Sequence, residues 1–155
     1  MAFDHSKKLS ELSDAVREST LKRLRRVPEG FENWRITSGA MSFADIAQHT
    51  IDADYWLFKK LEIRDIGPIK GKAGSIEISD RSQFLKLLEE LVQSGKQRTS
   101  LISGLSENDL DENIFDSRFG GEVSVWWVIV RGNLDHEIHH RGQIAAYLRA
   151  IESQL

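Results

Sequence analysis

Residues 123–153, VSVWWVIVRGNLDHEIHHRGQIAAYLRAIES, decide the fold of this 155-residue chain. The stretch follows the Gly120–Gly121 pair, contains no proline and opens with the apolar run Val123–Val130. Because proline interrupts helices and glycine pairs favour breaks, we expect one helix here, the longest of the chain. A helix that begins so apolar is expected to lie at the centre of the molecule.

Three further helices are expected upstream. The first covers about residues 6–26 on an apolar stripe of leucines. The second runs for about 20 residues from Ser42, which can form a capping box with Asp45 three residues later. The third runs from Asp80 to about Ser103. Four long helices without a convincing alternating strand predict an all-α fold, a four-helix bundle.

Long connections separate these helices. Residues 28–41 contain three large apolar side chains, Asp65–Ser79 contains three glycines and a proline, and residues 104–122 contain a short helical turn capped by Ser106 with Asp109. The first two connections leave room for crossovers instead of tight hairpins. The length of the chain fits a single domain over residues 1–155.

The composition excludes several classes of protein. A net charge of −3 argues against a chain-wide nucleic-acid surface. No segment approaches the roughly 20 apolar residues that span a bilayer, and the N-terminus lacks a signal-peptide core. We therefore expect a cytoplasmic protein with no nucleic-acid or membrane partner. The chain has no cysteine, so it has no disulfides, no thiolate ligands and no cysteine nucleophile.

Three of the five histidines cluster in the segment DHEIHH, residues 135–140. On a helix, His136 and His140 lie one turn apart on the same face, the spacing with which two imidazoles bind one metal ion. Such a pair on a polar helix face is often simply solvated. The central position of this helix favours the metal, because two buried imidazoles need a partner.

The side chains around the pair are candidates for the floor of a pocket. Asn133, Gln143 and Tyr147 lie within about 60° of His136 at 100° per residue. His139 lies about 60° to the other side, so it is a weaker third ligand and a better supporting or surface group.

The segment HEIHH also matches the pattern H-E-x-x-H, in which two histidines bind zinc and the glutamate is the base. The extended form of that motif needs glycine at position 143 and histidine at 146, where this chain has Gln143 and Ala146. The glutamate-ligand form needs a following helix, and only 15 residues follow His140. We reject a zincin protease and keep Glu137 as a residue beside the site.

A third ligand must come from His5 or His49. His5 lies in a polar terminus, where fraying is the default. His49 lies inside the second helix and can point inward at the last one. Three histidines with one open position are typical of a catalytic zinc-type site.

Two segments carry a family resemblance. Residues 42–61, SFADIAQHTIDADYWLFKKL, resemble the second helix of the DinB-like (DinB/YfiT) superfamily, and residues 136–149, HEIHHRGQIAAYLR, are similar to the end of its last helix. The run SENDLDENIF also looks like the family's connection before that helix. The resemblance places the metal triad on His49, His136 and His140, with nickel or zinc as the ion, and it implies a homodimer.

Related proteins include thiol-dependent S-transferases and isomerases, and many members have no known activity. We therefore expect a metal-dependent enzyme that activates a low-molecular-weight thiol, or water, against a small-molecule substrate. Since the chain has no cysteine, any sulfur comes from the cosubstrate. A metal-dependent hydrolase and a non-catalytic, metal-binding stress-response module are the alternatives.

The dimer has a second motivation in the segment Trp126–Trp127–Val128. Adjacent helical residues point about 100° apart, so one bundle interior cannot easily take all three side chains. Either a second chain covers the apolar side chains that do not fit the interior, or the connection at Phe31–Ile36 packs against them.

Overall fold

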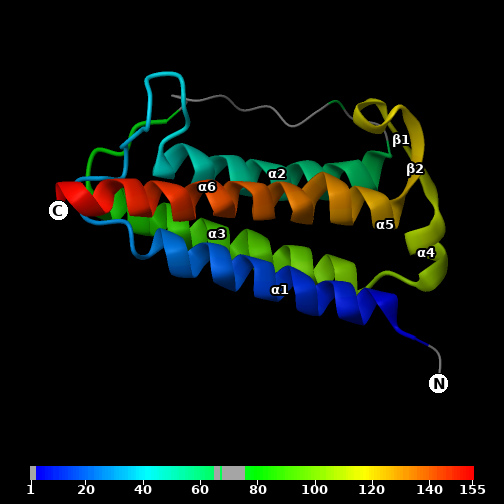
Figure 1. Ribbon diagram of the computed structural model, residues 1–155. Coiled ribbons are helices and arrows are strands. Elements are labelled where there is room, and N and C mark those ends of the chain that lie inside the picture. The colour runs from blue at the N-terminus through cyan, green and yellow to red at the C-terminus, as the bar shows by residue number, and fades with distance from the viewer. Residues whose placement is uncertain (1–2, 65–66, 68–75) are drawn as a thin grey trace.

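Four helical rods form the bundle in the computed structural model, which describes residues 3–64, 67 and 76–155 (Figure 1). The first three are α1 (His5–Leu24), α2 (Phe43–Ile63) and α3 (Arg81–Ser103). The fourth, which we call the C-terminal rod, is continuous over residues 125–154. It comprises α5 (Val125–Trp127), the π-helical η2 (Val128–Leu134), α6 (Asp135–Ile151) and η3 (Glu152–Gln154). The expected all-α, four-helix architecture is confirmed.

The predicted helix starts are also found. The Ser42 hydroxyl accepts the Asp45 amide at 3.0 Å, and the Asp45 carboxylate accepts the Ser42 amide in return. The Asp80 carboxylate caps α3 by accepting the Gln83 amide at 2.9 Å. Ser106 begins the short helix α4 (Glu107–Asp111) with a second capping box. Each cap satisfies amide groups that the first turn of a helix leaves without an intrahelical partner.

The helices are arranged so that consecutive ones do not pair as hairpins. α1 packs against α3 and α6, and α2 packs against the same two, so α1 and α2 lie at opposite corners. α2 and α3 run in the same direction (Figure 1). The connection predicted at Asp65–Ser79 lies largely outside the described residues.

The sequence showed no convincing alternating strand, yet the structure contains one small sheet beside the helices. A two-stranded antiparallel hairpin, β1 (Asn113–Asp116) and β2 (Gly121–Ser124), precedes the C-terminal rod and pairs Ile114 with Val123. The strand sequences NIFD and GEVS do not alternate apolar and polar residues, so they lack the pattern that marks a half-buried strand. The turn contains η1 (Ser117–Phe119) and Gly120. Gly120 and Gly121, with which β2 begins, both have positive φ, which glycine adopts without strain. Hence the rod begins at Val125, two residues later than expected.

The apolar core is divided in two. One cluster gathers residues from the C-terminal half of α1, the beginnings of α2 and α3 and the end of α6. The other gathers residues from the opposite end of the bundle, including Trp56, Ile114 and Ile129. Between them, along every one of the four rods, lie buried polar and charged side chains. This polar layer adjoins the site described below.

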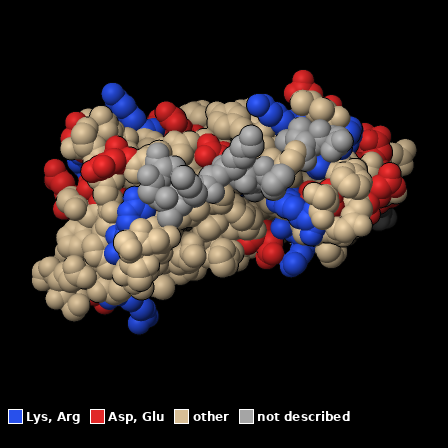
Figure 2. Space-filling model, turned by 90° about the horizontal axis from the view of Figure 1, so that it is seen from above, with Lys and Arg blue, Asp and Glu red and all other residues tan. Residues whose placement is uncertain are grey.

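The outer surface mixes charges of both signs. In Figure 2, Lys and Arg lie among Asp and Glu toward both ends of the visible face, as the nearly balanced charge of the chain leads one to expect. Among the described residues, no helix combines the length and the apolar character that crossing a membrane requires.

Candidate metal centre

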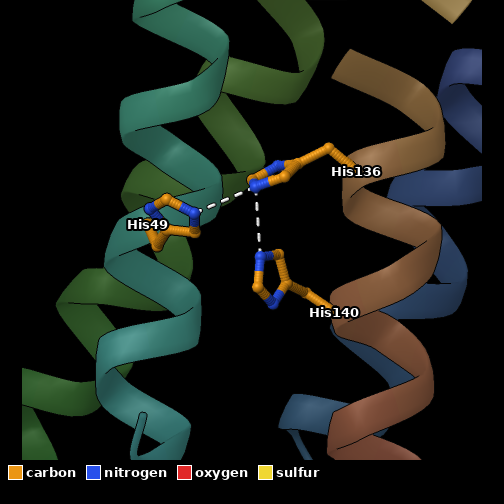
Figure 3. Close-up of side chains that lie close together, drawn as sticks. All are labelled: His49, His136 and His140. Atoms are coloured by element: carbon orange, nitrogen blue, oxygen red, sulfur yellow. Dashed lines mark hydrogen bonds between the residues drawn. The ribbon is translucent and has the colours of Figure 1, made fainter. Parts of the chain in front are cut away.

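Three imidazoles from two helices converge on one point (Figure 3). The Nε2 atom of His136 lies 2.9 Å from Nε2 of His49 and 3.1 Å from Nε2 of His140. His49 comes from α2, whereas His136 and His140 are one turn apart on α6. The structure thus brings together the three histidines singled out from the sequence. His5 lies elsewhere, with its ring paired to Glu107 at the start of α4.

The other ring nitrogens show which atoms face inward. The Nδ1–H of His140 donates to the Gln143 side-chain oxygen at 2.7 Å, which leaves a lone pair on its Nε2. The Nδ1 atoms of His49 and His136 are buried and have no hydrogen-bond partner among the described residues. All three rings therefore present Nε2 to the same point.

The site disfavours protons on these rings. Burial lowers the pKa of His136 to about 3, and the neighbouring imidazoles and Arg118 act in the same direction. Burial also lowers the pKa of His140 to about 4, although its bond to Gln143 opposes the shift. The pKa of His49 is lowered by burial too. Neutral imidazoles are the form that binds metal.

The donor set fits a divalent ion of the zinc or nickel type. Imidazole nitrogens bind zinc at about 2.0–2.1 Å, so two nitrogens on one tetrahedral ion lie about 3.3 Å apart. The two short Nε2 separations are within a few tenths of an ångström of that value. Three lone pairs directed at one point repel each other unless a proton or a cation lies between them. A metal ion satisfies all three at once.

A model of the DinB superfamily matches residues 13–144, which include all three histidines. The chain belongs to the DinB superfamily. The family and the three-histidine group of this DinB-like protein are compatible with metal binding.

Three solved structures share the DinB-like fold. A DinB-like protein from Bacillus subtilis is 17% identical, with a TM-score of 0.70 over 93% of this chain and 91% of that chain. A conserved protein from Enterococcus faecalis is 17% identical, with a TM-score of 0.70 over 96% and 97%. An uncharacterized protein from Clostridium difficile 630 is 12% identical, with a TM-score of 0.69 over 96% and 98%. None of the curated proteins matches the sequence.

The residues expected beside the pair have different surroundings. Gln143 contacts His140, as described above, and Tyr147 packs edge-on against Trp34 and Phe43. His139 is exposed and touches only the edge of the site through the His140 ring. Gln143 is thus in contact with the site, whereas Tyr147 belongs to the core cluster near the C-terminal end of α6.

Asn133 and Glu137 belong to the polar layer. The Asn133 amide donates to the Ala53 carbonyl at 3.1 Å, and its oxygen accepts from Arg98. The helical wheel placed Asn133 on the face of His136, but residues 128–134 are π-helical. The wider π turn changes the rotation per residue, so a wheel drawn at 100° fails upstream of Asp135.

Sequence reasoning missed the charged centre of this layer. Each of the four rods contributes one buried charge: Arg17, Asp54, Arg98 and Glu137. Arg17 donates to Glu137 through Nε at 2.8 Å and to Asp54 through Nη2 at 2.7 Å. Arg98 donates to the same two carboxylates. The two arginines balance the two acids, so the layer carries no net charge.

These pairs set the ionisation of Glu137. Burial alone would raise the pKa of the carboxyl, but Arg98 and Arg17 outweigh it and hold the pKa at about 2. The same carboxylates keep the pKa of Arg17 above its ordinary value despite burial. A glutamate bound by two arginines is not available as a general base, which agrees with the rejection of the zincin motif.

The sequence did contain a signal for the layer. Asp54 is flanked three residues away by the buried Ile51 and Leu57, so it lies on the apolar face of α2. Gly95 is a second signal, because a Cβ there would lie 2.7 Å from Nη1 of Arg17. A charge on an apolar face and a glycine inside a helix together indicate a buried cation from a neighbouring rod.

Proposed function

We propose that this DinB-like protein binds one divalent ion, zinc or nickel, through His49, His136 and His140. The observation that carries the proposal is the convergence of three Nε2 atoms, two of them on rings whose Nδ1 atoms have no partner among the described residues. Three protein ligands leave a position for an exogenous group, the arrangement typical of catalytic sites.

The chemistry that such an ion supplies is a lowered pKa for a thiol or a water, giving a nucleophile near neutral pH. We propose transfer of a low-molecular-weight thiol to a small electrophile as the reaction, because the chain has no sulfur nucleophile of its own. His140 is held by Gln143, and the exclusion of protons from the rings keeps the ligands neutral.

A hydrolase that uses the same site is the second candidate, and a non-catalytic metal-binding module is the third. An assay that incubates the metal-loaded protein with electrophiles, with and without added thiols, distinguishes the three candidate functions. Consumption that requires a thiol assigns S-transfer, and thiol-independent consumption assigns hydrolysis. No turnover with any pair supports the module.

The ligand set has a direct test in metal content. After equilibrium dialysis against zinc or nickel, wild type should retain one ion per chain. His49→Ala and His140→Ala should each lower the affinity more than about 100-fold, since even the loss of an outer supporting residue costs 10–100-fold. His139→Ala is the matched control, because its exposed ring lies beside His140, and it should keep its metal. Full occupancy in either triad variant would contradict the proposal.

We also propose a homodimer. Trp126 and Trp127 are 38% and 39% exposed at the start of the C-terminal rod, whereas Val128 is buried. Phe31 and Trp34 pack against the other core cluster, so the connection that could have covered these tryptophans lies elsewhere. Light scattering at micromolar concentration should give about twice the 17.7 kDa of one chain. A monomer mass would refute it.

The cytoplasmic location stays a prediction.

A further inference from the structure

Arg118 lies in η1, between the two strands, and is held in one orientation by Asp116. Its Nε and Nη2 groups donate to the two carboxylate oxygens at 3.1 and 2.9 Å, and its backbone amide donates to the same carboxylate at 3.0 Å. The Asp116 side chain is almost fully buried, whereas that of Arg118 is 27% exposed. A surface arginine is thus anchored from below by a buried acid.

The guanidinium is also fixed from its flat side. It stacks on the Trp56 ring, with its central carbon 4.1 Å from the ring centroid. Gly132 permits this stack, because a Cβ there would lie 3.0 Å from Nη2 of Arg118 and 3.3 Å from the Trp56 ring. Three elements, η1, α2 and η2, therefore cooperate to place one cation.

The cation is placed beside the metal centre. Gly132 precedes His136 by four residues on the same rod, and Trp56 follows His49 by seven residues on α2. Counted along the C-terminal rod the offset is about one helical turn, and counted along α2 it is about two, so roughly 5–10 Å along the axis separates the guanidinium from the level of the three imidazoles. A ligand with two or three carbons between its reacting atom and a second group can span the lower part of that range.

One edge of the guanidinium has no hydrogen-bond partner among the residues that the structure describes. Asp116 takes the edge formed by Nε and Nη2, and the described residues offer no hydrogen-bond partner to Nη1. The edge formed by Nη1 and Nη2 presents two parallel N–H groups, the geometry that suits a carboxylate. Asp116 balances part of the positive charge of Arg118. The free edge should therefore orient a bound carboxylate and favour it moderately over a neutral group, without binding it strongly.

We propose that Arg118 binds the carboxylate of a small-molecule substrate whose other end reaches the three-histidine site. The inference rests on the proposed metal function and deepens it by naming the substrate class. Arg118 is the specificity-determining residue, Asp116 and Trp56 hold it in position, and Gly132 gives it room. The protein accordingly discriminates between an acid and its neutral amide.

The test uses the full-length, zinc-loaded protein and two thiol probes of nearly equal shape, 3-mercaptopropionate and 3-mercaptopropanamide. Isothermal titration calorimetry should show that wild type binds the acid about tenfold more tightly than the amide. Arg118→Gln should abolish this preference and leave amide binding within twofold. Arg131→Gln is the matched control, because this exposed arginine of η2 pairs with Asp135 and should keep the tenfold preference.

Metal content measured on each sample separates the two levels of the proposal. Wild type that takes up neither zinc nor nickel contradicts the metal function itself. Zinc-loaded wild type that shows no preference, or Arg118→Gln that keeps it, overturns the role of Arg118 alone. If Arg118→Gln does not fold by circular dichroism, Arg118→Lys takes its place. It keeps the charge but lacks the planar edge, and should reduce the preference at least threefold; an unchanged preference overturns the inference.

Discussion

Replacing Arg98 with methionine is expected to destabilise the protein by about 3–5 kcal/mol, the usual cost of removing one partner from a buried ion pair. The Arg98 side chain is fully buried and donates to Asp54, Glu137 and Ser13. Methionine replaces the aliphatic stem of the side chain without the guanidinium, and it leaves Arg17 to serve two buried carboxylates. The free energy of unfolding from urea titration measures the loss.

Arg131→Met is the control for that experiment. Arg131 pairs with Asp135 one turn away, and both side chains are about half exposed. Exposed pairs of this kind contribute at most about 1 kcal/mol. A loss for Arg98→Met no larger than that of Arg131→Met would show that the polar layer relaxes or admits water when one cation is removed.

Acidification is expected to destabilise the metal-stripped protein by at least about 3 kcal/mol between pH 7 and pH 4.5. Unfolded histidine binds a proton near pH 6.5, whereas His136 and His140 in the folded state have a pKa of about 3 and about 4. The unfolded state therefore binds more protons in this window, and stability falls as the pH falls. Each unit of pKa shift corresponds to about 1.4 kcal/mol.

Stripping the metal separates the effect of protons on the rings from the loss of the ion. His136→Gln should flatten the dependence between pH 6.5 and 4.5, and His139→Ala should leave it unchanged. Below pH 4.5 a further loss is expected from Glu137, whose depressed pKa of about 2 gives stability that disappears as the pH falls toward 2. Unfolding free energies that stay constant from pH 7 to 4.5 would contradict the assignment of buried, neutral imidazoles.

The features that the sequence predicted well are local ones. The caps at Ser42 and Asp80 depend on side chains three residues apart, and the pair His136–His140 depends on one helical turn. His49 could be selected because the chain has so few histidines. Each of these inferences needs the geometry of a single helix and no knowledge of its neighbours.

The features that escaped prediction depend on contacts between distant segments. Arg17 and Glu137 are 120 residues apart in the chain, so no local pattern links them. The π-helical turn at residues 128–134 has no distinct signature in apolar periodicity, and it displaced Asn133 from the expected face. The position of Arg118 depends on a hairpin too short to be recognised and on Trp56 of another helix. Contacts between elements on different sides of the bundle determine all three of these features.

The polar layer also limits how the rods can slide along one another. Two apolar helix faces pack almost equally well when one shifts by a turn, about 5.4 Å, because leucine meets leucine in either position. A shift of that size in any rod would leave a buried charge opposite an aliphatic side chain. Since Asp54 lies near His49 in α2 and Glu137 is adjacent to His136, the axial alignment that pairs the charges is also the one that brings the imidazoles together. Replacing the whole layer with apolar side chains could therefore preserve a stable bundle. The three imidazoles would then no longer be held at one defined position.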